Sequence, residues 1–317
     1  MNKSCLIGFL MCSAFSLVVQ AATDGAHITK TISQIERKKG IKRTIQYRPD
    51  GNDFVCVNGK NRYTRALYGG ITDFRIETSD RPVFATYKPK DSKHICFRLQ
   101  CGNQSIALDS LKFCEARYRA GRRTYRLTDP LLGKGELNIS VLAFPDAEGG
   151  IWRFTMKDMP EGALLHCYIS EIRAKNLSRN GDMGADRADS FDAPQLPKEQ
   201  KHYKLSLDGT TAYIVVEDQE LRLPALVEGT SLYDKSEKWR SEIESSLQIS
   251  TPDPYFNPLG GALAAAADGI WDGKIWLHGA IGWRSQLNGW RAAYIGDFIG
   301  WHDRARTHFD SYAASQV

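Results

Sequence analysis

Short runs of alternating hydrophobic and polar residues dominate the chain from about residue 31 to residue 227. The runs are rich in β-branched and aromatic residues, and turn-forming pairs such as Asn58-Gly59 and Asp208-Gly209 separate them. Because many short strands follow one another with no helix between them, the pattern predicts an antiparallel β-sandwich. The Asn58-Gly59 pair suits a type I′ hairpin turn. The predicted strands are 42–47, 53–57, 63–67, 72–78, 83–87, 95–99, 137–143, 151–156, 164–169, 204–207, 212–216 and 220–223.

Beyond residue 230 the spacing of apolar residues becomes helical. A connector helix is predicted over 231–246, with Leu232, Ser236, Trp239 and Ile243 on one face. An alanine-rich run predicts a second helix over 259–270 because alanine has the highest helix propensity. A third helix is predicted over 290–312, where apolar residues cover most of the circumference, and it therefore belongs inside a larger helical domain.

The first residues have the features of a secretory signal peptide. Lys3 precedes the apolar run Cys5–Val19, and small residues lead to a cleavage site after Ala21. No other stretch is long and apolar enough to cross a membrane. We therefore expect an exported protein, periplasmic or extracellular, that makes no contact with the membrane once the signal is removed.

Composition excludes several classes of partner and cofactor. With 42% hydrophobic and 25% charged residues the chain can build a sizeable core, and its net charge of +5 is mild. The densest basic run, Ile35–Arg43, has no interleaved aromatic residues, so we expect no nucleic-acid partner. No His and Cys spacing predicts a metal site, and no cofactor motif occurs. The cysteines beyond the signal fit no disulfide framework, and we expect small buried side chains at Cys56, Cys96, Cys101, Cys114 and Cys167.

The richest candidate chemistry lies between residues 271 and 306, where Trp, Arg, His and Asp interleave. This mixture suits a sugar, because indole rings cover the apolar face of a pyranose while charged groups bond its hydroxyls. An arginine also suits a uronate carboxylate. The alternative is that these residues pack or pair in an interior. The candidate substrate-binding residues are Trp276, His278, Trp283, Arg284, Trp290, Arg291, Asp297 and His302.

The segments 61–84 and 271–306, in the order sandwich, connector helix, helices, resemble the six-hairpin glycosidases. More narrowly, the chain is similar to secreted bacterial six-hairpin-like proteins with an N-terminal domain of unknown function, typical of gut polysaccharide degraders. The resemblance implies that a β-sandwich leads through a linker helix into an (α/α)6 barrel. The expected domains are a signal peptide (1–21), a β-sandwich (22–228), a linker helix (229–250) and the incomplete start of a barrel (251–317).

The resemblance implies an N-terminal fragment of an exported glycoside hydrolase-like protein that acts on complex glycans, with an oligo- or polysaccharide as partner. A barrel of this class needs six hairpins, and the sequence supplies about one, so we expect a truncated protein that is inactive alone. Glycoside hydrolysis needs two carboxyl groups, and residues 251–317 contain aspartates but no glutamate. The catalytic residues therefore stay unassigned. The alternative is a non-catalytic carbohydrate-binding β-sandwich module.

Overall fold

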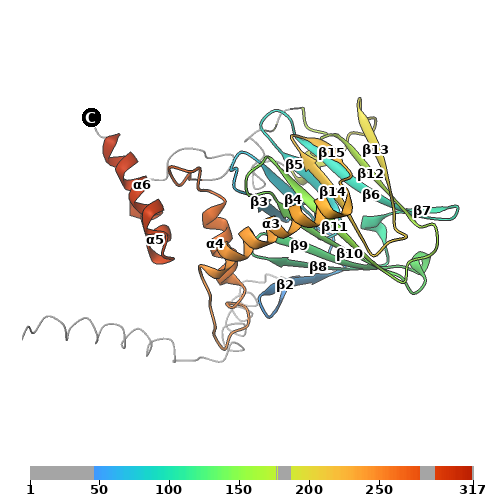
Figure 1. The fold of residues 1–317 in the computed structure, drawn as a ribbon, viewed down its shortest axis with the longest axis horizontal. Coiled ribbons are helices and arrows are strands. Elements are labelled where there is room, and N and C mark those ends of the chain that lie inside the picture. The colour runs from blue at the N-terminus through green and yellow to red at the C-terminus, as the bar shows by residue number, and fades with distance from the viewer. Residues whose placement is uncertain (1–45, 176, 178–186, 279–289, 316–317) are drawn as a thin grey trace, which may run out of the picture.

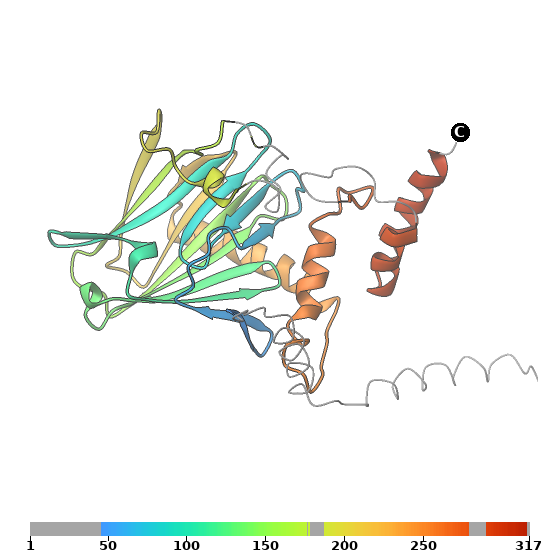
Figure 2. The same cartoon turned by 180° about the vertical axis from the view of Figure 1, so that it is seen from behind.

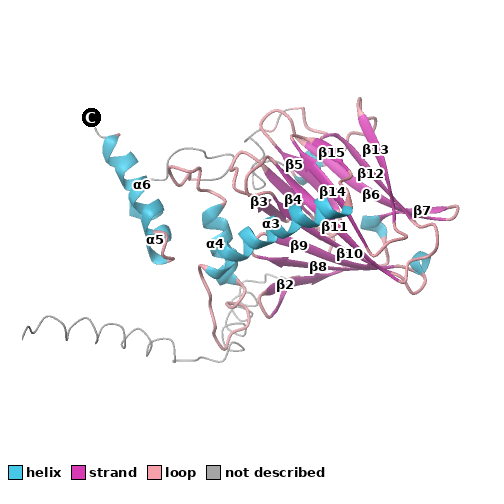
Figure 3. Ribbon diagram, viewed as in Figure 1, coloured by secondary structure: helices cyan, strands magenta, loops and turns pink. Residues whose placement is uncertain are grey.

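Two antiparallel β-sheets lie face to face and a few helices follow them (Figure 1; Figure 3). The computed structural model describes residues 46–175, 177, 187–278 and 290–315, and only the backbone of residues 188 and 290–293. The mainly β fold predicted from the sequence, a sandwich with helices after it, is confirmed. The predicted signal peptide lies outside the described residues.

One sheet has eight strands in the order β1-β2-β8-β9-β10-β11-β14-β15. Every neighbouring pair within it is antiparallel. The short β1 was not predicted from the sequence, and neither were β8 and β9, whose outward positions carry arginine. The strands are β1 (Arg48–Asp50), β2 (Asp53–Val57), β8 (Phe113–Arg119), β9 (Arg122–Thr128), β10 (Glu136–Ala143), β11 (Gly149–Lys157), β14 (Thr211–Glu217) and β15 (Glu220–Arg222).

The other sheet has seven strands in the order β13-β12-β6-β5-β4-β3, with β7 paired to β6. Its strands are β3 (Arg65–Tyr68), β4 (Arg75–Thr78), β5 (Val83–Tyr87), β6 (Lys93–Cys101), β7 (Gln104–Ala107), β12 (Leu164–Glu171) and β13 (Gln200–Ser206). Because β2 and β3 belong to different sheets, the predicted hairpin at Asn58-Gly59 is wrong. The chain crosses between the sheets there, and the Asn58 side chain accepts a hydrogen bond from the Cys114 backbone nitrogen at 2.9 Å.

Side chains from both sheets fill the space between them. Phe84 is fully buried and meets three other aromatic rings edge-on: Phe97 at 5.8 Å, Tyr125 at 5.7 Å and Trp152 at 5.6 Å between ring centroids. Edge-to-face contacts of this kind add to the free energy of burial. All the cysteines beyond the signal are free thiols, and Cys56, Cys114 and Cys167 are buried.

The helices are α3 (Leu226–Ser245), α4 (Leu259–Asp268), α5 (Trp290–Phe298) and α6 (His302–Ala314). Helix α3 lies on the outer face of the eight-stranded sheet and contacts β10, β11 and β14 (Figure 1; Figure 2). Its buried face consists of Gly229, Tyr233, Ser236 and Arg240. Of the predicted face, Leu232, Ser236, Trp239 and Ile243, only Ser236 is buried. Tyr233 takes the central place instead and packs in one cluster with Leu142, Ile151 and Val215 of the sheet. None of the described helices is both long and apolar enough to cross a bilayer.

The single helix predicted over 290–312 is wrong, since α5 ends at Phe298 and α6 begins at His302. Gly300 has a φ of 86°, which places it in the left-handed region that glycine adopts without strain. The backbone nitrogen of Trp301 donates to the Gly296 carbonyl at 2.7 Å. The backbone nitrogen of Gly300 donates to the Asp297 carbonyl at 3.2 Å. These two bonds form a Schellman motif, which ends a helix.

Candidate functional site

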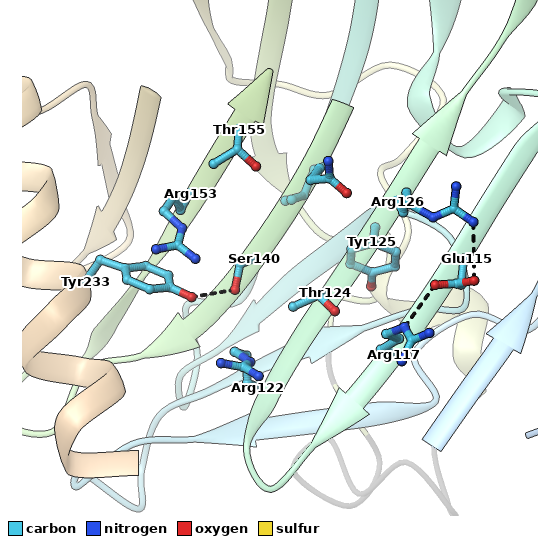
Figure 4. A pocket seen from close by; sticks show the side chains of 12 residues that line it. Glu115, Arg117, Arg122, Thr124, Tyr125, Arg126, Ser140, Arg153, Thr155 and Tyr233 are labelled. Carbon is cyan, nitrogen blue, oxygen red and sulfur yellow. Dashed lines mark hydrogen bonds and ion pairs between the residues drawn. The ribbon is translucent and has the colours of Figure 1, made fainter. Parts of the chain in front are cut away.

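A polar groove lies on the outer face of the eight-stranded sheet beside α3 (Figure 4). Its volume is roughly 330 Å³. Small-molecule sites occupy about 300–1,000 Å³, so the groove can hold a small ligand or one part of a longer one. Strands β8 to β11 form its floor, and Tyr233 of α3 forms one wall. The basic and uncharged polar residues of the lining are Arg117, Arg122, Thr124, Arg126, Asn138, Ser140, Arg153 and Thr155.

Strand register arranges these side chains in two rows across the sheet. Side chains alternate between the faces of a strand, so residues paired in register face the same way. One row contains Arg117, Thr124, Ser140 and Arg153 on successive strands. The neighbouring row contains Glu115, Arg126, Asn138 and Thr155. With adjacent strands about 4.8 Å apart, each row presents a line of hydrogen-bonding groups long enough for an extended ligand.

One carboxylate, Glu115, pairs with two of the groove arginines. Glu115 accepts from Arg117 at 2.9 Å and from Arg126 at 3.4 Å (Figure 4). Asp50 also accepts from Arg117 at 2.7 Å. Burial alone raises the pKa of Glu115, but the bonds from the two guanidinium groups lower it below its ordinary value overall. Glu115 is therefore ionised at neutral pH and holds both arginines in place.

Tyr233 joins the helix to the groove. Its hydroxyl lies 2.7 Å from the Ser140 Oγ atom, and its ring lies against the guanidinium of Arg153, 3.8 Å from the ring centroid (Figure 4). Such a cation–π contact fixes the orientation of the guanidinium plane. Next to it, Arg122 donates to Glu237 of α3 at 2.7 Å. The helix therefore both closes one side of the groove and orients its basic groups.

The structure spreads the predicted binding residues over different surroundings. Trp276 is fully buried, and its indole nitrogen donates to the Ala267 carbonyl at 3.1 Å. Its ring lies 4.6 Å from that of Trp271 between centroids. A fully buried indole presents no ring face to a ligand, so Trp276 belongs to a small core in this structure. His278 is exposed.

Among the other predicted residues, the structure brings Asp297 and His302 together. The His302 Nδ1 atom lies 2.7 Å from the Asp297 carboxylate, and both side chains are largely exposed. Trp283 and Arg284 lie outside the described residues. Trp290 and Arg291 begin α5, and their side chains also lie outside the description. The joint site predicted for residues 271–306 stays a prediction.

The helical region contains an ion pair between the buried Asp268 and Arg304. The Asp268 carboxylate accepts from Arg304 at 2.7 Å. The Arg304 guanidinium also lies 4.4 Å from the ring centroid of Trp301. Burial raises the pKa of Asp268, and the bond from Arg304 opposes that shift. The pair links α4 to α6 and is packed against the Trp271 and Trp301 rings. No group of three or more potential metal ligands occurs in the described part of the chain.

The groove was not predicted, although the sequence of β8 contains the pattern of its polar face. In β8 the polar residues Glu115, Arg117 and Arg119 alternate with the inward residues Cys114, Ala116 and Tyr118. This period of two is the pattern of a strand with one polar face. The arginines at outward positions make the run resemble a charged loop. The alternation of polar and inward residues, not the charge, identifies it as a strand.

Comparison with known families concerns the floor of the groove. A search of curated proteins found no match. Strands β6 to β14, which include all four strands of the groove floor, fall within one matched segment. Residues 89–217 of this chain match the family described as Domain of unknown function (DUF4450).

Proposed function

We propose that this chain is a glycan-binding N-terminal part of an exported glycoside hydrolase-like protein, and that the groove beside α3 is its binding site. The observation that carries this proposal is the line of arginine, hydroxyl and amide groups across β8 to β11, next to the Tyr233 wall. Hydroxyl and amide groups exchange hydrogen bonds with sugar hydroxyls, and two parallel rows fit an extended chain better than a compact metabolite. The partner is an oligo- or polysaccharide outside the cytoplasm.

In this proposal the chain binds glycan but does not cleave it. Hydrolysis needs two carboxyl groups that flank the glycosidic bond, one on each side. In the helical region Asp268 is paired with Arg304, and Asp272 accepts from the backbone nitrogens of Lys274 and Ile275. These two carboxylates are held in structural contacts, and the exposed Asp297 pairs with His302, so the proposal assigns no pair of catalytic carboxyl groups to the helical region. Catalytic groups would come from further helices of an (α/α)6 barrel.

An apolar hollow between α4 and α5 supports the barrel part of the proposal. Its volume is roughly 550 Å³. Leu263 and Phe298, which line it, are 54% and 78% exposed. Large apolar patches on a soluble surface mark interaction sites. We expect Leu263→Ser with Phe298→Ser to reduce self-association of the chain, measured by analytical ultracentrifugation. Unchanged sedimentation would count against a packing role for this surface.

The glycan-binding proposal is tested by filling the groove. Thr124 lies in the middle of one row, and Thr124→Trp would place an indole across it. The matched control, Lys204→Trp, adds the same side chain to exposed β13 of the other sheet. Affinity electrophoresis against plant and animal polysaccharides should show retardation of the wild type and the control, and little for Thr124→Trp.

Two outcomes would contradict the proposal. Equal retardation of Thr124→Trp and wild type would place binding elsewhere, and the absence of retardation with every polysaccharide would remove the binding function. Release of reducing ends by this chain alone would contradict the non-catalytic part. Thermal unfolding followed by circular dichroism would show that each variant is folded.

A further inference from the structure

Arg153 differs from the other arginines of the groove in its partners. Arg117 and Arg126 share Glu115, and Arg122 pairs with Glu237. Among the described residues, no carboxylate pairs with Arg153, and its Nε atom is buried without a hydrogen-bond acceptor. An arginine cannot lose its proton in a protein, so this charge persists at every physiological pH. The groove therefore contains a half-buried positive charge that the described structure does not compensate.

The surroundings of Arg153 orient it for a ligand. The Tyr233 ring covers one face of the guanidinium, with 3.8 Å between the guanidinium carbon and the ring centroid. The Ser140 hydroxyl lies next to it in the same row, bonded to the Tyr233 hydroxyl (Figure 4). Stacking holds the guanidinium plane but leaves its edge available, and the edge is where the N–H groups point. A fixed guanidinium edge matches the two oxygens of a carboxylate.

A neutral sugar would leave this charge uncompensated. Sugar hydroxyls accept hydrogen bonds from Arg153, but they bring no negative charge into a groove that is partly shielded from water. A carboxylate forms two parallel charge-assisted bonds with the same group, and these are about twice as strong as neutral ones. Thr124 and Asn138, on neighbouring strands, then face the hydroxyls of the same or adjoining sugar units.

We propose that the groove binds acidic glycans, and that Arg153 binds the carboxylate of a uronic acid unit. This inference rests on the proposed glycan-binding function of the groove. Since Arg153 is the arginine without a carboxylate partner in the described groove, the site recognises one acid group, while the paired arginines contribute shape and hydrogen bonds. The specificity is therefore for a uronate at one position of the ligand.

The test compares acidic glycans with their methyl esters, which differ in charge but hardly in shape. Probes are oligosaccharides of galacturonate, alginate and hyaluronan, each with its methyl ester, titrated into the full chain by calorimetry. At least one acidic probe should bind about tenfold or more tightly than its ester. Arg153→Leu should weaken binding of that acidic probe by about the same factor and weaken binding of the ester much less. Arg153→Lys, which keeps the charge but loses the fork, should fall between them.

Controls separate recognition from folding. Arg98→Leu removes an arginine from the outer face of the other sheet, where it bonds Ser105, and should not change binding. Arg153→Leu removes a buried donor that has no acceptor, but it also removes the contact with the Tyr233 ring, so its melting temperature should stay close to that of the wild type.

The outcomes distinguish this inference from the function on which it rests. Equal affinity for acid and ester in every probe pair would overturn the inference and leave glycan binding intact. The same would follow if Arg153→Leu weakened acid and ester equally, or if only neutral glycans bound. If no glycan of either kind binds, the proposed function itself fails.

Discussion

Gly229 fixes how closely α3 approaches the sheet, and Gly229→Ala tests this contact. At an exposed helix position, Gly→Ala stabilises a protein by about 1 kcal/mol because alanine has the higher helix propensity. At Gly229 the added Cβ would lie 2.3 Å from the Cδ2 atom of Tyr213 and 2.5 Å from its Cγ atom. The Tyr213 ring is buried and cannot swing away. Overpacking of this kind costs about 1–3 kcal/mol.

The overpacking cost should therefore cancel or exceed the gain in propensity. We expect Gly229→Ala to lower the free energy of unfolding by about 0–2 kcal/mol, measured by urea denaturation followed through circular dichroism. A double-mutant cycle isolates the cause. Tyr213→Ala removes the two closest contacts and leaves one at 2.8 Å to the Cβ atom, which a small shift relieves. On that background Gly229→Ala should be neutral or stabilising, with a coupling energy of about 1 kcal/mol or more.

Two results would refute this reasoning. If Gly229→Ala stabilises the wild type by the full propensity gain, the helix is not in tight contact with the sheet. If its effect is the same on both backgrounds, the contact with Tyr213 is not the cause. Because α3 carries Tyr233, a helix displaced by the substitution should also weaken any ligand binding in the groove.

Three further predictions concern buried polar groups. Arg123→Leu should lower the free energy of unfolding by about 3–5 kcal/mol, because it leaves Asp80, 3.7 Å away and also fully buried, without its cation; a change below 1 kcal/mol in urea denaturation would contradict this. Burial lowers the pKa of His94, so its contribution to stability is complete above the unfolded value of about 6.5 and is lost as pH falls from there through the folded value. Between pH 7 and pH 5 the wild type should thus lose more stability than His94→Gln, and parallel pH profiles would exclude this role. Burial raises the pKa of Cys114 to about 12, so mass spectrometry should detect iodoacetamide labelling at pH 8 only after unfolding; rapid labelling of the native protein would show that the thiol is accessible.

Regular alternation made much of the sandwich predictable from the sequence. The predicted strands at Asp53–Val57 and Val83–Tyr87 have the bounds found for β2 and β5. The missed strands include β1 and β7, which are only three and four residues long. The longer missed strands, β8 and β9, carry arginines outward and, at Arg123, one inward. Inward arginine breaks the hydrophobic pattern on which the prediction depends. Its place in the core is explained by partners distant in sequence, such as the Ser79 carbonyl at 2.9 Å, which no local pattern reveals.

The site was harder to predict than the fold because it depends on register and docking. Alternation in one strand shows that Arg153 faces outward, but only the pairing of four strands places it in a row with Thr124 and Ser140. Only the docking of α3 adds Tyr233. By contrast, the richest local composition, between residues 271 and 306, includes Trp276, which is buried. Aromatic content alone does not separate a ligand platform from a core.

The outer strands of the eight-stranded sheet have a consequence for assembly. The edge strand β1 is three residues long and contains Pro49, which offers no backbone donor. The opposite edge strand, β15, is also three residues long and contains the charged residues Glu220 and Arg222. Short, charged margins are poor templates for an added strand from another molecule. At high local protein concentrations, this sheet should therefore resist growing into fibrils.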